Sequence, residues 1–210
     1  MIDPKNFYSS VRQSFQPITR GLAGRGVTPN MLTMTGITLN LVAAALIVLG
    51  CFYWAAGVFV VASLCDLLDG AVARYAGKES AFGAFLDSTT DRISEGITLA
   101  ALGLYFARVQ GYGELAAIFV FLIASFLVSY TRARAEALGL QCKVGLMSRP
   151  ERIIVLTVGF VFHRWYVLSI VLYALAVLTS HTVLQRVLHV RRQLRKVELP
   201  EAAGPGAGAD

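Results

Sequence analysis

Long apolar blocks constrain this chain more than any other feature. Six of them follow one another between residues 31 and 187, and all but one approach or exceed the ~20 residues that a helix needs to cross a bilayer. Lipid offers no hydrogen-bond partners, so each block must satisfy its own backbone groups as a helix. Only 15% of the residues are charged, against about 25% in soluble domains. The sequence therefore predicts an all-α integral membrane protein with six transmembrane helices.

The signals for helix starts are clear at two of these blocks. Thr28 and Pro29 provide an N-cap and a favoured first residue for the first helix. Ser148 and Glu151 have the spacing of a capping box ahead of the shortest block. The expected helices cover residues 31–49, 52–75, 83–106, 115–138, 153–162 and 165–187.

The distribution of lysine and arginine predicts how the helices are oriented. Sixteen of the 19 basic residues lie in the N-terminal segment, in the second-to-third and fourth-to-fifth connections, and near the C-terminus. The opposite connections hold only Arg108 and Arg164. Because basic residues favour the cytoplasmic side, we expect a multi-pass cell (inner) membrane protein with both termini in the cytoplasm.

Three regions are expected along the chain. Residues 1–28 alternate aromatic and basic positions, as in a cytoplasmic amphipathic helix lying in the headgroup layer; a loosely ordered basic tail is the alternative. Residues 29–198 form the six-helix domain. Residues 199–210 are rich in Gly, Ala and Pro and are expected to be a disordered tail.

Four aspartates interrupt the second and third apolar blocks, although a carboxylate at the centre of a membrane helix costs about 2.5–3.5 kcal/mol. Asp66 and Asp69 are three positions apart, Asp87 and Asp91 are four apart, and each pair shares a helix face. A short connection between the two helices allows all four acids to reach one cavity. Ionised carboxylates that crowd together need cations among them, and oxygen ligands select Mg²⁺, Mn²⁺ or Ca²⁺. Two such ions would clamp a diphosphate.

Two other interpretations of these acids are possible. They could pair with Arg74 and Arg92 as structural ion pairs, but two arginines cannot neutralise four carboxylates and Glu95. They could instead line the path of a cation transporter. The acids gather near one side of the membrane, whereas a conduction path needs polar groups in both halves. The role of Glu95, as a group behind the metal ligands or as a partner of Arg92, stays undecided.

The acidic stretch resembles the signature of the CDP-alcohol phosphotransferase family. The pattern D-x2-D-G-x2-A-R-x8-G-x3-D-x3-D is matched at all eight fixed positions from Asp66 to Asp91. Members of this family are six-helix membrane enzymes, usually homodimers, that move a phosphatidyl-type group from a CDP-linked lipid to an alcohol and release CMP. The resemblance implies Mg²⁺ or Mn²⁺ as the cofactor, with two ions.

The resemblance also implies roles for single residues. Asp91 is the expected general base, which also touches a metal. The expected metal ligands are Asp66, Asp69, Asp87 and Asp91. The expected nucleotide contacts are Asn30, Met31, Leu32, Thr33, Gly70, Arg74 and Ser80.

The segment after the fourth block is similar to that of the bacterial members of the family that join CDP-diacylglycerol to inositol 1-phosphate. A phosphorylated acceptor needs an anion site of its own, and Arg132, Arg152 and Arg186 could form one if the cytoplasmic ends of their helices converge. The alternative is that these arginines face lipid headgroups. Glycerol 3-phosphate as the acceptor, or an archaeal-type ether lipid as the donor, is the alternative reaction.

The expected product is phosphatidylinositol phosphate, made at an active site that faces the cytoplasm. The expected partners are CDP-diacylglycerol, inositol 1-phosphate, membrane lipids and a second copy of the chain. No nucleic-acid partner is expected.

Overall fold

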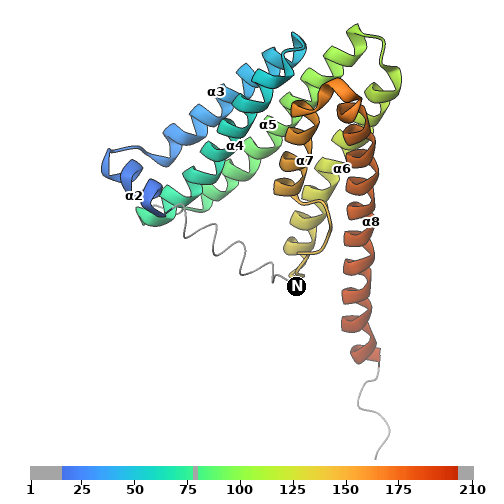
Figure 1. Cartoon of the computed structure of the whole chain (residues 1–210). Coiled ribbons are helices and arrows are strands. Elements are labelled where there is room, and N and C mark those ends of the chain that lie inside the picture. The colour runs from blue at the N-terminus through green and yellow to red at the C-terminus, as the bar shows by residue number, and fades with distance from the viewer. Residues whose placement is uncertain (1–15, 78–79, 203–210) are drawn as a thin grey trace, which may run out of the picture. The chain divides into compact units, whose positions relative to one another are not determined.

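The computed structural model describes residues 16–77 and 80–202. Within these ranges every regular element is helical, with seven α-helices and one short 3₁₀ helix (Figure 1). The chain divides into two compact units, residues 1–109 and residues 110–210. The all-α prediction is therefore confirmed, and each unit is a separate helical body.

The first unit is built around one central helix. Its elements are α2 (Gln16–Gly24), α3 (Pro29–Val48), α4 (Phe52–Tyr75) and α5 (Ala81–Arg108). Helix α3 packs against both α4 and α5, and α2 packs against α4. Thr28 is the N-cap of α3, as predicted, and its hydroxyl accepts the Met31 N–H at 3.3 Å.

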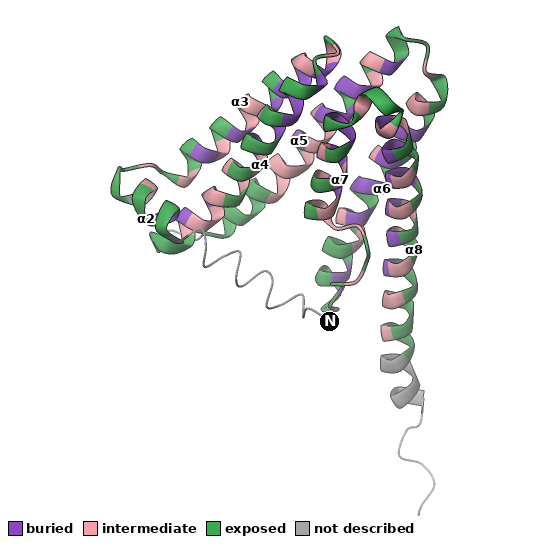
Figure 2. Ribbon diagram, viewed as in Figure 1, coloured by how far each residue is buried: buried purple, intermediate pink, exposed green. Residues whose placement is uncertain are grey.

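Small side chains allow α3 and α4 to approach closely. The buried face of α3 includes Gly36, Ala43 and Ala44, and that of α4 includes Ala55 and Ala62 (Figure 2). Helices in lipid associate by close packing rather than by the hydrophobic effect, so small residues at a contact are favourable. The packing fixes the position of α3 beside the acidic end of α4.

A polar contact joins α3 to α5. The Thr98 hydroxyl donates to the carbonyl of its own helix at Ser94 (3.0 Å) and lies 3.4 Å from Asn40 Oδ1 on α3. All three residues are buried. Such bonds hold two apolar helices in one register, because slippage would leave a polar group unsatisfied.

The second unit is built around the last helix. Its elements are α6 (Tyr112–Ala137), α7 (Arg149–Val161), η1 (His163–Trp165) and α8 (Val167–Ala202). Helix α8 packs against α6, α7 and η1. Ser148 is the N-cap residue of α7, as predicted, but its hydroxyl binds the Glu151 carboxylate rather than the backbone N–H groups of the helix. The predicted cap residue is confirmed, but the helix begins at Arg149 rather than at residue 153, and the bond from a helix N–H to the Ser148 hydroxyl that a capping box requires is not formed.

Four helices in the described part of the chain are long and apolar enough to cross a membrane: α3, α4, α6 and residues 167–195 of α8. Helix α5 is long enough, but Asp87, Asp91 and Glu95 lower its hydropathy. Helix α7 has only 13 residues. The chain is thus a multi-pass membrane protein, and the two further spans remain a prediction.

The predicted boundaries fit the observed helices closely at α4, while α8 extends 15 residues beyond the expected end at residue 187. The proposed tail begins inside the last turn of α8, and residues 203–210 lie outside the described part. Residues 1–15 of the proposed interfacial segment also lie outside it.

Candidate active site

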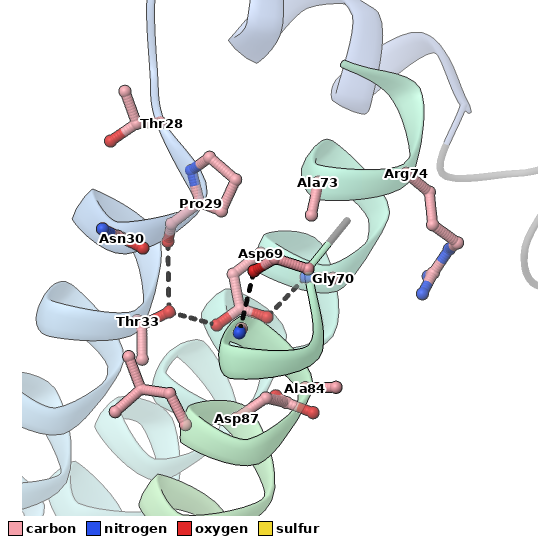
Figure 3. Close-up of a pocket in the computed structure, with 13 residues that line it drawn as sticks. Thr28, Pro29, Asn30, Thr33, Asp69, Gly70, Ala73, Arg74, Ala84 and Asp87 are labelled. Carbon is pink, nitrogen blue, oxygen red and sulfur yellow. Dashed lines mark hydrogen bonds between the residues drawn. The ribbon is translucent and has the colours of Figure 1, made fainter. Parts of the chain in front are cut away.

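A pocket of about 510 Å³ opens where the start of α3, the end of α4 and the start of α5 meet (Figure 3). It lies wholly within the first unit. Its lining residues are Thr28, Pro29, Asn30, Thr33, Asp69, Gly70, Ala73, Arg74, Ser80, Gly83, Ala84, Leu86 and Asp87.

Asp69 is the buried acid of this pocket, with only 4% of its surface exposed. The Thr33 hydroxyl donates to Asp69 Oδ2 at 2.6 Å, and the Gly70 N–H donates to Asp69 Oδ1 (Figure 3). Thr33 comes from α3 and Asp69 from α4, so the packing of these two helices holds the carboxylate in place. Hydrogen bonds to both oxygens fix the orientation of this carboxylate.

Asp87 and Asp66 lie near Asp69 in different ways. Asp87 is exposed and lines the same pocket from α5. Asp66 lies one turn earlier on α4 and its carboxylate rests against Gly36 of α3. Both are within electrostatic range of Asp69. The structure therefore places three of the four predicted acids in one neighbourhood.

Asp91 is not part of the pocket lining. It lies one turn after Asp87 on α5, and one of its oxygens is 3.7 Å from Arg92 Nη1. Asp66 is also absent from the lining. No group of three or more acidic, histidine or cysteine side chains within the described ranges lies close enough together to hold a metal ion. The oxygen-only donor set suits a hard divalent cation, but the four acids do not converge on one point.

The predicted nucleotide contacts divide into two groups. Asn30, Thr33, Gly70, Arg74 and Ser80 line the pocket. Met31 and Leu32 occupy the same first turn of α3 but are not among the lining residues; Met31 is exposed and Leu32 is buried.

Arg74 lines the pocket from the last turn of α4, and Ser80 lines it from the start of α5. A Cβ at Gly70 would lie 3.4 Å from Arg74 Nη1, so the glycine leaves room for the guanidinium beside the pocket. Ser80 is the N-cap of α5, and its hydroxyl accepts the Gly83 N–H at 3.0 Å. A helix N-terminus and a guanidinium are both favourable neighbours for phosphate.

Some residues that line the pocket are not among the predicted contacts. Thr28 and Pro29 were assigned only to capping, and Ala84 and Leu86 were not assigned at all. The signal for Thr28 and Pro29 was present, because they directly precede the predicted contact Asn30. Ala84 and Leu86 carry no chemical signal, and only the packing of α5 brings them to the pocket.

A second polar cluster lies in the second unit. It consists of Arg132 on α6, Arg152 on α7 and Arg186 on α8. Arg132 and Arg152 both lie within electrostatic range of Arg186. The three predicted acceptor residues are therefore brought together.

The two buried arginines are held by backbone carbonyls. Arg152 is 3% exposed and its Nη1 donates to the Met147 carbonyl at 3.0 Å. Arg186 is 6% exposed; its Nε donates to the Val144 carbonyl at 2.9 Å, and its Nη1 donates to the Val128 carbonyl.

Arg132 is the exposed member of the cluster. Its Nε donates to Glu136 Oε1 at 2.8 Å. Glu136 also lies within electrostatic range of Arg186. The three guanidinium groups of the cluster outnumber the Glu136 carboxylate, and the excess of positive charge suits an anion.

Comparison with known proteins identifies the family. The sequence model for CDP-alcohol phosphatidyltransferases matches residues 26–184. The phosphatidylinositol phosphate synthase of Streptomyces avermitilis is 37% identical, over 92% of this chain and 85% of its own length. The archaetidylinositol phosphate synthase of Pyrococcus horikoshii is also 37% identical, over 88% of this chain and 94% of its own length.

Solved structures of the phosphatidylinositol phosphate synthase of Mycobacterium tuberculosis are similar in fold. The crystal structure with CDP-DAG bound has a TM-score of 0.77 and 36% identity, covering 83% of this chain and 92% of that one. A second crystal structure of that enzyme, in complex with manganese and citrate, has the same TM-score and identity, and covers 83% of this chain and 87% of the other. The residues matched by the family model include the whole acidic signature from Asp66 to Asp91 and two of the three arginines, Arg132 and Arg152. Arg186 lies just beyond residue 184. This chain belongs to the CDP-alcohol phosphatidyltransferase family.

Proposed function

We propose that this chain transfers the phosphatidyl group of CDP-diacylglycerol to inositol 1-phosphate, giving phosphatidylinositol phosphate and CMP. The observation that carries the proposal is the presence of two separate phosphate-binding chemistries in one chain. One is the acidic pocket with Arg74 beside it, and the other is the cluster of Arg132, Arg152 and Arg186. A phosphorylated acceptor requires the second, because free inositol or serine has no phosphate to bind.

The pocket suits the CDP end of the donor. Asn30 and Thr33 offer polar side chains, and Gly70 and Ala73 leave the backbone accessible. Arg74 supplies a guanidinium for the pyrophosphate. Met31 and Leu32 are assigned to the same binding region through their place in the first turn of α3.

The metal site is assigned to Asp66, Asp69, Asp87 and Asp91, with Mg²⁺ or Mn²⁺ in two positions. The carboxylate donors and the manganese complex of the M. tuberculosis relative support this assignment. Bound ions would neutralise the negative charge of the pyrophosphate. For all four acids to serve as ligands, Asp66 and Asp91 must turn toward the pocket that Asp69 and Asp87 already line.

Asp91 is assigned as the general base. The acceptor hydroxyl loses its proton to this carboxylate while its oxygen attacks the phosphorus that carries the diacylglycerol. A new P–O bond forms to inositol, and the P–O bond to CMP breaks. The electron pair of the broken bond leaves with CMP, next to Arg74.

An acceptor screen tests the assignment. Purified protein in detergent is given CDP-diacylglycerol with Mg²⁺ and one acceptor at a time, and CMP release is measured. We expect release with inositol 1-phosphate and none without a divalent ion. Release that is equally fast with free inositol, serine or glycerol 3-phosphate would contradict the proposed acceptor.

The second candidate differs only in the lipid donor. The archaetidylinositol phosphate synthase of P. horikoshii is as similar in identity as the bacterial relative, so an ether-linked CDP-archaeol is the alternative substrate. Parallel assays with CDP-diacylglycerol and CDP-archaeol at equal concentration decide between the two. A higher kcat/KM for the ether lipid would favour the alternative.

The arrangement in the membrane is proposed from the sequence. Helices α5 and α7 are assigned as the two further spans, third and fifth along the chain, with both termini and the active site on the cytoplasmic side of the inner membrane. The charge asymmetry of the connections supports this topology. A homodimer of six-helix domains over residues 29–198 is proposed from the family resemblance, with residues 1–28 at the membrane surface.

A further inference from the structure

The connection between α6 and α7 is anchored to α8 by a buried threonine. Thr182 is fully buried, with 0% of its surface exposed. Its hydroxyl accepts the Met147 N–H at 3.1 Å and donates to the Leu178 carbonyl of its own helix at 2.9 Å. Met147 lies just ahead of Ser148, the N-cap residue of α7.

Met147 connects this threonine to the arginine cluster. The carbonyl of Met147 accepts a hydrogen bond from Arg152 Nη1 at 3.0 Å. The N–H of Met147 is held by Thr182, and its C=O holds Arg152, so the two side chains act on the same residue. An arginine has five N–H donors in one rigid plane, and a bond from one of them sets the direction of the rest.

The methyl group of Thr182 makes a second contact with the connection. Gly145 has a φ of +129°, and a Cβ placed there would collide with Thr182 Cγ2. The same Cβ would lie 3.6 Å from Arg186 Nε. The connection thus passes close to α8 at a position where only glycine fits, between the threonine and the second buried arginine.

We propose that Thr182 is a positioning residue for the acceptor phosphate: through Met147 it sets the guanidinium plane of Arg152, and through its methyl contact with Gly145 it keeps the connection against Arg186. This inference rests on the proposed function, because it assigns the arginine cluster to the acceptor. Thr182 does not touch the acceptor itself. Its hydroxyl and its methyl have separate tasks, which separate substitutions can remove.

The chain provides a matched control on the same helix. Thr179 lies one turn before Thr182 and is equally buried, with 0% exposure. Its hydroxyl has no hydrogen-bond partner within the part of the chain that the structure describes. Replacement of either threonine by valine keeps the shape and removes only the hydroxyl, so the two variants differ in the bonds that the Thr182 hydroxyl makes to Met147 and to the Leu178 carbonyl of its own helix.

Steady-state kinetics with both substrates test the proposal. Thr182→Val should raise the KM for inositol 1-phosphate about three- to tenfold, the range for one lost hydrogen bond, with kcat and the KM for CDP-diacylglycerol within about twofold of wild type. Thr182→Ser keeps the hydroxyl but lacks the methyl contact with Gly145, so its acceptor KM should lie between those of wild type and Thr182→Val. Thr179→Val should leave it unchanged. An unchanged acceptor KM in Thr182→Val, or an equal rise in Thr179→Val, would overturn the proposal.

Arg152→Gln, measured alongside, separates this inference from the proposed function. A raised acceptor KM in Arg152→Gln with a normal one in Thr182→Val would leave the arginine site standing and remove the role of Thr182. A normal acceptor KM in Arg152→Gln would remove the arginine site itself, and the inference with it.

A second variant covers the case in which Thr182→Val does not fold. Gly145→Ala should raise the acceptor KM, because its Cβ pushes against Thr182 Cγ2. The rise should be smaller in the Gly145→Ala/Thr182→Ser double variant, which lacks that methyl group. An equal rise in both backgrounds would show that the effect does not pass through Thr182.

Discussion

Among single residues, the proposed general base Asp91 gives the sharpest test of the chemical step. Asp91→Asn removes the proton acceptor and keeps the size of the side chain, so turnover should fall about 100-fold or more while CDP-diacylglycerol still binds. CMP release and binding of the CDP-lipid, measured on the same preparation, check both parts. Glu114→Gln, on α6 in the other unit, is the matched control and should behave as wild type. Near-normal turnover in Asp91→Asn would remove this residue from the role of base.

The hydrogen bond from Thr33 to Asp69 can be tested by removing the Thr33 hydroxyl. Thr33→Val removes the donor that lies 2.6 Å from Asp69 Oδ2, so the affinity for Mn²⁺ should fall about 10- to 100-fold, as for other groups that hold a metal ligand in place. Thr35→Val is the control, because the Thr35 hydroxyl bonds only to the carbonyl of Met31 on its own helix among the described contacts. Titration of Mn²⁺ by electron paramagnetic resonance provides the readout. Equal affinities in the two variants would contradict a supporting role for Thr33.

The sequence predicted the identity of these residues better than their contacts. Asp69, Asp87 and Arg74 could be chosen because charged groups in an apolar block need a reason to be there. The bond from Thr33 to Asp69 spans 36 positions, and no local pattern indicates it. The contact of Thr182 could not be predicted from the sequence for the same reason, since its partner Met147 is 35 positions away.

At the scale of elements, the close contact between α3 and α4 can be tested by adding a Cβ at Gly36. A Cβ at Gly36 would collide with the Asp66 carboxylate and lie 3.5 Å from the Ala62 carbonyl. Gly36→Ala should therefore lower both the melting temperature and the turnover, although alanine is the better helix former by about 1 kcal/mol. Gly57→Ala on α4 has nothing within 4 Å of its added Cβ and should be neutral or stabilising.

Thermal unfolding in detergent and CMP release measure the two variants together. A Gly36→Ala protein that is as stable and active as Gly57→Ala would show that α3 and α4 do not need this close approach. The outcome concerns the packing of two helices and leaves the identity of the acceptor open.

Some elements followed from local signals and others did not. The bounds of α4 and the cap of α3 at Thr28 were predictable from apolar length and capping chemistry. The extension of α8 was not, because the polar residues after 187 indicate the end of the membrane but not the end of a helix. Lysine, arginine and glutamine are good helix formers, so the helix continues into a polar environment.

The topology is the prediction at the scale of the whole molecule. If α5 and α7 cross the membrane, residues near Arg108 and Arg164 face outward and the segment after Arg74 faces inward. Alkaline phosphatase fused after Arg108 should then be active in cells, and the same enzyme fused after Gly77 should be inactive. Green fluorescent protein fused at the same positions should give the opposite pattern, which controls for expression. Activity after Gly77 would contradict the proposed orientation.

At this scale the sequence predicted the class of molecule and part of its architecture. An apolar chain with few charges must be a membrane protein, and the four long apolar helices agree with that. Helices α5 and α7 are harder to assign, since one carries the acids of the site and the other is short. Their place in the membrane depends on neighbours and bound ions, which a hydropathy pattern does not contain.

The number of manganese ions bound per chain tests the central claim most directly. Electron paramagnetic resonance of the purified protein with CDP-diacylglycerol should count two ions in wild type, and fewer or weaker ions in Asp69→Asn and in Asp87→Asn. Glu114→Gln should match wild type. Manganese binding that is unchanged in both aspartate variants would contradict the claim that the acids of α4 and α5 hold metal against a pyrophosphate.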